Sequence, residues 1–325
     1  MRTMKAAVVT KLKRVECQDV GMPESTRGLV LVKTTMASIC GSDLHIAYMG
    51  WNVNKFPLPP GHPGHEAIGK VVDGGDTEFN NSQNVLTLPN VWKSRAFAEY
   101  QLIEPQYLLQ TPNNVPTPHL LMAQQLGTVI YADSHLPPLD GKTVTVIGQG
   151  SAGLFHDFIV KNMGASRLIV IDPIPERLAI GKRFGADIAI DVTGGKAIDA
   201  VLDLTNGHGS DVVIEAVGST DTVNQAIKLA RPMGWITAFG LPTTAKKIPF
   251  DWDTFFRKCL HMQSVVGAQD EPGLPDFRKA LKLIISGDID VSPLITHKIH
   301  ISKVQEAFDL ASTKDQGAIK VSLTF

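Results

Sequence analysis

The chain has 325 residues, of which 43% are hydrophobic and 19% charged, and its formal net charge is −1. This length favours two domains, and a near-neutral chain without a basic run argues against nucleic acid as a partner. No apolar run approaches the roughly 18 residues that a membrane-spanning helix needs, and the first residues lack the apolar core of a signal peptide. The three cysteines, Cys17, Cys40 and Cys259, are too far apart to suggest a disulfide framework, so we expect a cytoplasmic protein.

The first third of the chain is predicted to be mostly β-structure. Short runs rich in valine, leucine and isoleucine are separated by turn residues, and strands are expected at Ala6–Val9, Gly28–Thr34 and Glu66–Val72. The proline-rich segment Lys55–His65 cannot be a helix interior or a central strand. It is therefore expected to be an extended loop, and we interpret His62 within it as a loop histidine.

From about residue 118 the pattern changes to an alternation of helices and short apolar strands. Helices are expected at Leu120–Asp133, Ala152–Met163, Pro175–Phe184, Ala197–Leu204 and Thr220–Leu229. Strands are expected at Thr143–Ile147, Leu168–Ile171, Ala186–Ile190, Val212–Ala216 and Trp235–Phe239. This alternation predicts a parallel sheet with both faces covered. The remaining segments, Asp276–Ser286 and Ile299–Phe325, return to mixed helix and strand.

The segment Val144–Leu154 (VTVIGQGSAGL) combines a strand, a G-x-G-x-x-G turn and the start of a helix. In such a turn the first glycine permits the tight bend, the second lets the backbone approach a pyrophosphate, and the third lets helix and strand pack closely. The pyrophosphate would lie at the helix N-terminus, where free N–H groups favour an anion. The residues expected to contact the dinucleotide are Gly148, Gln149, Gly150, Ser151, Ala152 and Gly153.

The next strand ends in Asp172, 22 residues after Gly150, where a carboxylate can accept hydrogen bonds from the adenosine ribose hydroxyls. Asp172 would repel a 2′-phosphate, and the nearest basic residue, Arg177, is five positions further on. NAD is therefore favoured over NADP. The open alternative is a glycine turn in another kind of α/β sheet, with Asp172 capping a helix.

Thiolate, imidazole and carboxylate are all zinc ligand types, and Cys40, His65 and Glu66 supply one of each. The segments that accompany them in chain order are CGSDLH (Cys40–His45), GHE (Gly64–Glu66), AFAEY (Ala96–Tyr100), GQGSAG (Gly148–Gly153), DPIPERLAIGKRFGAD (Asp172–Asp187) and GAIKV (Gly317–Val321). In these pieces, which span essentially the whole chain, the protein resembles the zinc-dependent medium-chain dehydrogenases, the superfamily of alcohol, sorbitol and threonine dehydrogenases.

The resemblance implies an α/β protein of two domains. A GroES-like, β-rich catalytic domain would comprise residues 1–117 and 287–325. A Rossmann domain with a doubly wound parallel sheet would comprise residues 118–286. The resemblance also implies that Val217 and Gly240 contact the cofactor.

The resemblance further implies a catalytic zinc held by Cys40, His65 and Glu66. Counting back from Gly148 places Gln124 at the remaining metal position, which either this glutamine or water would fill. The alternative is that Gln124 only forms hydrogen bonds within its helix.

Three residues that follow Cys40 match positions with catalytic roles in the family. Ser42 would accept the alcohol proton and pass it through the ribose to His45 at the surface, and Asp43 would orient a metal ligand. The alternative for His45 is a surface histidine without a role. The aromatic residues expected to form the wall of the substrate pocket are Tyr48, Trp51 and Trp92, which could instead serve packing alone.

Many relatives carry a lobe with four cysteines that holds a structural zinc, but Val72–Tyr100 contains no cysteine. We therefore expect one catalytic zinc per chain and no structural zinc. The predicted function is reversible hydride transfer between NAD and a polyol, sugar or secondary alcohol, in a homo-oligomer (dimer or tetramer). The alternatives are a zinc-free quinone or enoyl reductase of the same fold and a non-catalytic protein on an inherited fold.

Overall fold

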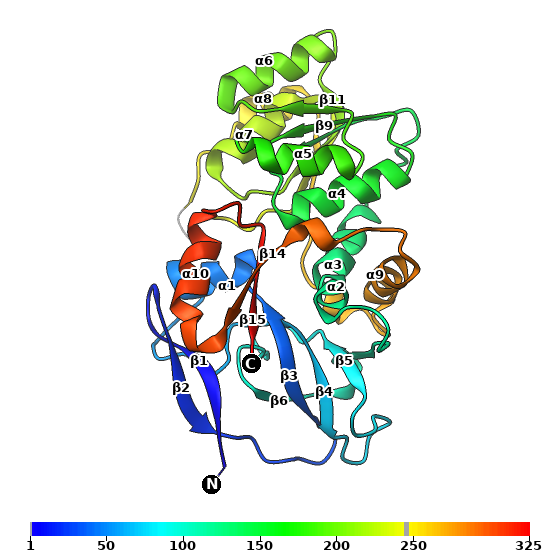
Figure 1. The fold of residues 1–325 in the computed structure, drawn as a ribbon. Helices are drawn as coiled ribbons and strands as arrows, with labels where there is room; N and C mark the ends of the chain where they lie inside the picture. The colour runs from blue at the N-terminus through cyan, green and yellow to red at the C-terminus, as the bar shows by residue number, and fades with distance from the viewer. Residues whose placement is uncertain (1, 244–246) are drawn as a thin grey trace. The chain divides into compact units, whose positions relative to one another are not determined.

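The computed structural model describes residues 2–243 and 247–325 (Figure 1). It divides into two compact units, Met1–Thr128 with Gly267–Phe325, and Val129–Val266. The helices are α1 (Gly41–Met49), α2 (Thr117–Leu121), α3 (Ala123–Asp133), α4 (Ser151–Asn162), α5 (Pro175–Arg183), α6 (Gly194–Leu204), α7 (Thr220–Leu229), α8 (Trp252–Arg257), α9 (Pro275–Ser286) and α10 (Val304–Thr313). The strands are β1 (Thr3–Lys11), β2 (Arg14–Gly21), β3 (Val30–Ser38), β4 (Glu66–Asp73), β5 (Asn84–Thr87), β6 (Tyr100–Ile103), β7 (Leu108–Gln110), β8 (Thr143–Ile147), β9 (Arg167–Ile171), β10 (Ile188–Ile190), β11 (Ser210–Glu215), β12 (Ala230–Ala238), β13 (His261–Ser264), β14 (Ile295–His300) and β15 (Lys320–Thr324). Among the described residues, no helix has both the length and the apolar character that crossing a bilayer requires.

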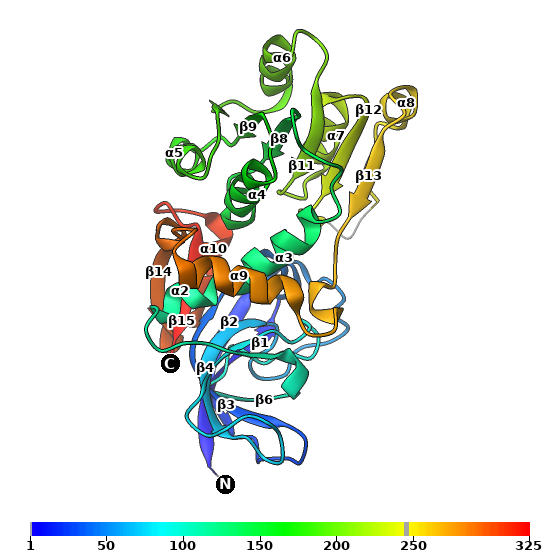
Figure 2. The same ribbon diagram turned by 90° about the vertical axis from the view of Figure 1, so that its right-hand side faces the viewer.

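The second unit is built on a parallel sheet with the strand order β10-β9-β8-β11-β12-β13. The strands are added outward on both sides of β8, which is the doubly wound arrangement. Side chains alternate between the two faces of a strand, so Val146 packs with Val160 of α4 while Ile147 packs with Val201 of α6 and Ile227 of α7. Figure 2 shows the helices on both sides of this sheet. The predicted Rossmann domain is confirmed.

The first unit is β-rich, as predicted. Its larger sheet has the order β14-β15-β3-β4-β5-β7, with β6 also pairing with β3, and β1 and β2 form a separate hairpin. A core around Phe97 and Phe308, whose rings lie 5.5 Å apart edge to face, joins the sheet to α10. Ile46 of α1 is part of the same core. This sheet carries β3 and β4 at its centre, and the candidate site lies where these two strands meet.

The structure corrects two boundaries. The single helix predicted over Leu120–Asp133 is two helices, α2 and α3, because the chain leaves the helical pattern at Met122. The segments 118–128 and 267–286 belong to the first unit rather than to the nucleotide domain. The physical reason is packing: α2 contacts β3, β4 and α9, and α9 lies so close to Gly127 that a Cβ there would stand 2.4 Å from the Phe277 ring.

Candidate active site

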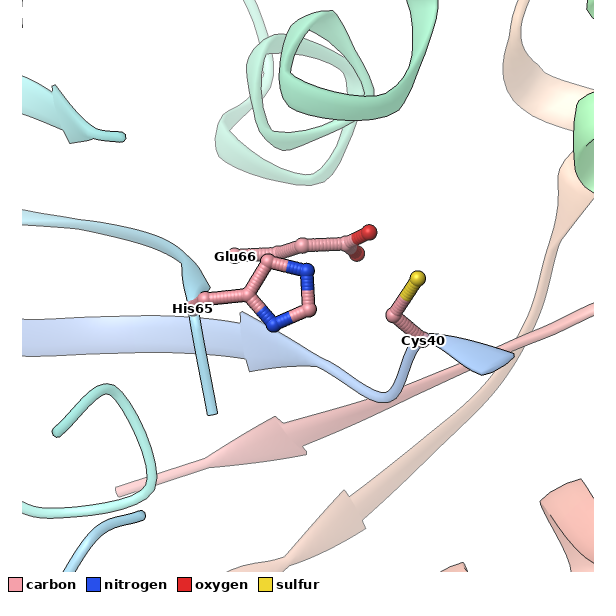
Figure 3. Close-up of side chains that lie close together, drawn as sticks. All are labelled: Cys40, His65 and Glu66. Carbon is pink, nitrogen blue, oxygen red and sulfur yellow. The ribbon is translucent and has the colours of Figure 1, made fainter. Parts of the chain in front are cut away.

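The register of three neighbouring strands assembles the candidate metal site. Ser38 at the end of β3 pairs with Glu66 at the start of β4, and on its other side Ser38 pairs with Ser322 of β15. Cys40 follows two residues after Ser38, and His65 directly precedes Glu66. The thiol, imidazole and carboxylate therefore converge, and their ligand atoms all lie within 4.8 Å of one another (Figure 3).

Asp43 fixes two members of this cluster from the first turn of α1. Its Oδ2 accepts a hydrogen bond from the Cys40 backbone N–H at 2.8 Å, and its Oδ1 accepts one from His65 Nδ1 at 2.9 Å. Burial would lower the pKa of His65, but the Asp43 carboxylate raises it well above the usual value. A carboxylate on Nδ1 directs the other ring nitrogen, Nε2, to a metal. Asp43 thus has the orienting position that the sequence predicted.

Glu66 presents one oxygen that has a full set of partners and one that has none. Its Oε2 lies 2.6 Å from Lys320 Nζ and also accepts a hydrogen bond from the Ser38 hydroxyl. Burial would raise the pKa of Glu66, but the Lys320 ammonium holds it below the usual value. Its Oε1 is buried without a hydrogen-bond partner in the protein. An ionised carboxylate with one free buried oxygen, beside a thiol and an imidazole, fits zinc.

Lys320 is a site residue that the sequence analysis did not single out. It is 2% exposed, and its ammonium contacts Gln125 Oε1 at 3.3 Å as well as Glu66. Burial alone would lower the pKa of Lys320, but the nearby Glu66 carboxylate outweighs burial and raises this pKa. A lysine flanked by Ile319 and Val321 is a signal that could have found it, because a lysine buried within such a segment needs a buried counter-charge.

Of the remaining catalytic candidates, Ser42 borders the metal cluster and His45 lies further along α1. Ser42 is buried, with Oγ 3.4 Å from His65 Nε2, and so borders the cluster. His45 lies one turn further along α1 and donates from Nδ1 to the Gly41 carbonyl at 2.6 Å. Its Nε2 is buried without a protein partner, while His45 as a whole is partly exposed.

Gln124 is 2% exposed near the start of α3. Its backbone carbonyl accepts a hydrogen bond from Thr128 Oγ1 at 3.2 Å. It is the next residue, Gln125, whose side chain reaches the buried Lys320. A metal contact by Gln124 therefore stays a prediction.

The aromatic candidates separate into two groups. Tyr48 donates from its hydroxyl to Asp309 Oδ1 at 2.6 Å, and its ring stacks on Phe308 at 6.0 Å. Tyr48 thus packs against α10, and its place in a pocket wall stays a prediction. The rings of Trp51 and Trp92 lie 5.6 Å apart, and that of His62 lies 6.1 Å from Trp92.

The second unit contains the predicted dinucleotide turn. Gly148 has φ of +94°, and a Cβ there would stand 2.6 Å from Val217 Cγ2. A Cβ on Gly153 would stand 1.8 Å from the Gly148 carbonyl oxygen. A Cβ on Gly240 would likewise collide with the backbone of Val217 and Gly218. The turn therefore lies at the carboxyl ends of β8, β11 and β12, which is where a doubly wound sheet binds its ligand.

Asp172 is tied to this turn by hydrogen bonds. Its Oδ2 accepts from the Gln149 backbone N–H at 2.7 Å, and its Oδ1 accepts from that of Ile174 at 2.9 Å. Arg177 is buried on α5, and burial lowers the pKa of its guanidinium while Asp172 opposes this. The acid is thus held at the end of β9, beside the first turn of the fingerprint.

Comparisons with known proteins agree with both units. Residues 26–113 match the model of the alcohol dehydrogenase GroES-like domain, and residues 153–286 match that of the zinc-binding dehydrogenases. L-threonine 3-dehydrogenase of Pyrococcus furiosus is 28% identical over 334 residues, which cover 94% of each chain. An alcohol dehydrogenase from Thermus sp. ATN1 has a TM-score of 0.81 at 25% identity over 99% of each chain. L-idonate 5-dehydrogenase of Escherichia coli has a TM-score of 0.83 at 24% identity, over 100% of this chain and 99% of its own.

These relatives give no support to the zinc-free alternative. The thiol, imidazole and free carboxylate oxygen of the first unit and the glycine turn of the second supply the two binding sites that such enzymes need. The chain belongs to the zinc-dependent medium-chain dehydrogenase/reductase superfamily and is an alcohol oxidoreductase that uses zinc and a nicotinamide cofactor.

Proposed function

We propose that this enzyme transfers hydride between NAD and a hydroxyl-bearing carbon of a polyol, a sugar or a secondary alcohol. Cys40, His65 and Glu66 hold one catalytic zinc, and Gln124 or water completes its shell. The observation that carries the proposal is the convergence of these three side chains within 4.8 Å, with one Glu66 oxygen left without a protein partner.

When bound, zinc would polarise the substrate oxygen and lower the pKa of the alcohol, and the nicotinamide would accept the hydride. The chain's own residues prepare this step. Asp43 holds the His65 ring with Nε2 toward the cluster, while Lys320 and Ser38 keep Glu66 ionised in a buried position. These contacts leave the ligand atoms little freedom to rearrange.

Proton removal is assigned to Ser42 and His45. The Ser42 hydroxyl borders the cluster, at 3.4 Å from His65 Nε2, and His45 lies one helical turn away on α1. Ser42 would accept the alcohol proton while passing its own outward, and His45 would receive it at Nε2, the nitrogen without a protein partner. Imidazole is the side chain whose charge ordinarily changes near neutral pH, which suits a proton carrier.

NAD is preferred over NADP because Asp172 stands at the end of β9. A carboxylate there accepts hydrogen bonds from two ribose hydroxyls, whereas a 2′-phosphate would bring like charges together. The close approaches at Gly148, Gly153 and Gly240 support a dinucleotide in the turn, with Gln149, Ser151, Ala152 and Val217 around it.

The test is a screen of NADH formation with polyols, aldonates, threonine and short secondary alcohols, run beside metal analysis. The relatives named above are a threonine, an alcohol and an idonate dehydrogenase, and these three substrate classes define the panel. We expect one zinc per chain and turnover that stops on chelation and returns with zinc. Two zincs per chain, or full turnover without metal, would refute the proposed site.

We also propose a homo-oligomer, a dimer or tetramer, in the cytoplasm. Trp252 and Phe256 on α8 are 63% and 68% exposed, which is unusual for aromatic side chains, and β13 is an edge strand of its sheet. The three cysteines are free thiols, as a reducing compartment would keep them. Sedimentation of the protein and of Trp252→Glu tests the assembly, because the variant should shift toward the monomer.

A further inference from the structure

A buried polar pair lies beneath the dinucleotide turn. Gln149, between the first two glycines of the fingerprint, donates from Nε2 to Asp157 Oδ1 at 3.2 Å. Asp157 lies on α4, two helical turns beyond the glycine turn, and both side chains are 0% exposed. Asp157 is not among the proposed cofactor contacts, and neither side chain of this pair follows from the G-x-G-x-x-G pattern.

Each member of the pair also carries an oxygen that lacks a donor. Gln149 Oε1 and Asp157 Oδ2 are both buried without a hydrogen-bond partner. Both oxygens lie close to Gly181 of α5, where a Cβ would stand 2.2 Å from the amide oxygen and 3.3 Å from the carboxyl oxygen. Two acceptors that lie against one glycine without a donor are costly in a buried site. A single proton on Asp157 would satisfy both, because Oδ2 could then donate to Gln149 Oε1.

The surroundings of Asp157 oppose its ionisation. Burial raises the pKa of Asp157 well above the usual value and outweighs the hydrogen bond from Gln149, which lowers it, and Asp133 on α3 adds to the rise. His156, the neighbour of Asp157 on α4, donates from Nδ1 to Asp133 Oδ1 at 2.8 Å rather than to Asp157. On the other side α5 presents Gly181 to the pair, while its Arg177 interacts with Asp172.

We propose that Asp157 is a positioning residue for the cofactor: as a neutral acid it forms two hydrogen bonds with the Gln149 amide and so holds the dinucleotide turn in its binding conformation. The backbone N–H of the same Gln149 donates to Asp172 at 2.7 Å. One residue thus connects the buried acid, the glycine turn and the carboxylate at the ribose position. Loss of the proton from Asp157 would place a negative charge against Gln149 Oε1 and loosen the turn.

The first test detects the proton itself and needs neither cofactor nor substrate. The infrared difference spectrum between the wild-type protein and Asp157→Asn at pH 7 should show the loss of a protonated carboxyl C=O band. The loss of an ionised carboxylate band instead would overturn the proposal. Because this measurement is made on the protein alone, its failure is distinct from any failure of the proposed dehydrogenase function.

The second test measures cofactor binding against pH, and it rests on the proposed use of NAD. Asn at position 157 can make both hydrogen bonds to Gln149 without a proton. The ratio of the NAD dissociation constants of wild type and Asp157→Asn should therefore rise as pH increases from 7 to 10. Asp199→Asn, which removes a carboxylate from the exposed face of α6, is the matched control and should follow the wild type.

A third variant removes both hydrogen bonds while keeping the branched shape of the side chain. Asp157→Leu should weaken NAD binding about 10-fold at pH 7, in line with the loss of a buried hydrogen-bonded pair. If Asp157→Leu does not fold, the infrared difference spectrum and the pH dependence of NAD binding by Asp157→Asn still test the proposal. A ratio of the two NAD dissociation constants, wild type to Asp157→Asn, that stays constant across the pH range would contradict the proposal. If NADP binds better than NAD, the same titration is made with NADP.

Discussion

The metal cluster of the first unit and the dinucleotide turn of the second are specified in opposite ways. The turn and its carboxylate come from one continuous segment, Gly148–Asp172, and they depend on missing atoms, since a Cβ at Gly153 would collide with the backbone. The metal cluster draws on β3, β4 and β15, and it depends on added charges, since buried Glu66 needs buried Lys320. The dinucleotide turn is therefore sensitive to added side-chain volume, and the metal cluster is sensitive to charge balance.

The largest expected effect comes from removing a metal ligand. Cys40→Ser replaces a thiolate with a much weaker ligand, so zinc content should fall from one per chain toward zero and turnover should be lost. Metal analysis and the NADH assay measure both. Cys259→Ser, at an exposed free thiol, is the matched control and should keep zinc and turnover. A Cys40→Ser protein with full zinc content would place the metal elsewhere.

Removing the proton acceptor should spare both binding sites but not the reaction. Ser42→Ala is expected to lower kcat by ~10²–10⁴-fold while zinc content and NAD affinity stay unchanged. His45→Ala should have a smaller effect, because water can replace a carrier near solvent, and concentrated imidazole buffer should restore part of its rate. If Ser42→Ala kept the wild-type kcat and pH profile, water would be the better candidate for the proton acceptor.

Charge balance at the metal site can be tested through stability. Lys320→Met leaves the buried Glu66 carboxylate without its counter-charge, and the free energy of unfolding of the zinc-free protein should fall by about 3–5 kcal/mol. Denaturant unfolding in the presence of a chelator measures this. The double variant Glu66→Gln/Lys320→Met removes both charges and should recover most of the loss. Equal instability of the single and double variants would show that Lys320 matters for packing rather than for charge.

The cofactor turn should respond to a change at Asp172 with a change in selectivity. Asp172→Ser removes the repulsion of a 2′-phosphate, so the ratio of kcat/KM for NAD to that for NADP should fall by about 10-fold. Asp191→Ser, at an exposed acid after β10, is the control and should leave the ratio unchanged. A wild-type preference for NADP would instead show that another residue, such as Arg177, sets the choice.

The smallest expected effect concerns His62, which lies outside both sites. Burial, aided by Arg95, lowers the pKa of His62 to about 4, whereas the unfolded chain titrates near 6.5. The unfolded state therefore binds the extra proton between these values, and stability should fall by about 1–2 kcal/mol as pH drops from 6.5 to 4. His62→Gln should reduce this loss in acid unfolding experiments. An unchanged pH dependence in the variant would assign the loss to other groups.

Elements whose pattern is local could be predicted from the sequence, whereas contacts between distant segments could not. The strand Thr143–Ile147 and the helix Thr220–Leu229 were predicted with the bounds that the structure gives, because their apolar patterns and flanking residues are local. Helix α1 was not predicted, since its Gly-Ser-Asp start resembles a turn and its buried residues do not form a clear helical stripe.

The partners across the sheet could not be predicted in the same way. The GAIKV segment was recognised as part of the family pattern, but nothing in the residues around Lys320 says that its partner is Glu66. That pairing depends on the register of β15 and β3, which is a property of the folded sheet. Asp157 was missed for a related reason, because a buried acid on an otherwise apolar helix face is explained only by the side chain of Gln149.

The distance along the chain between Glu66 and Lys320 has a consequence for biosynthesis. At elongation rates of 5–20 residues per second, roughly 13 to 50 seconds separate the appearance of the carboxylate at position 66 from that of its ammonium partner at position 320. Throughout this interval a closed sheet would bury an unpaired charge. We therefore expect the part of β3 and β4 near Glu66 to stay hydrated in the nascent chain until β15 has been synthesised. In that case β15, and not the first hairpins, completes the catalytic unit.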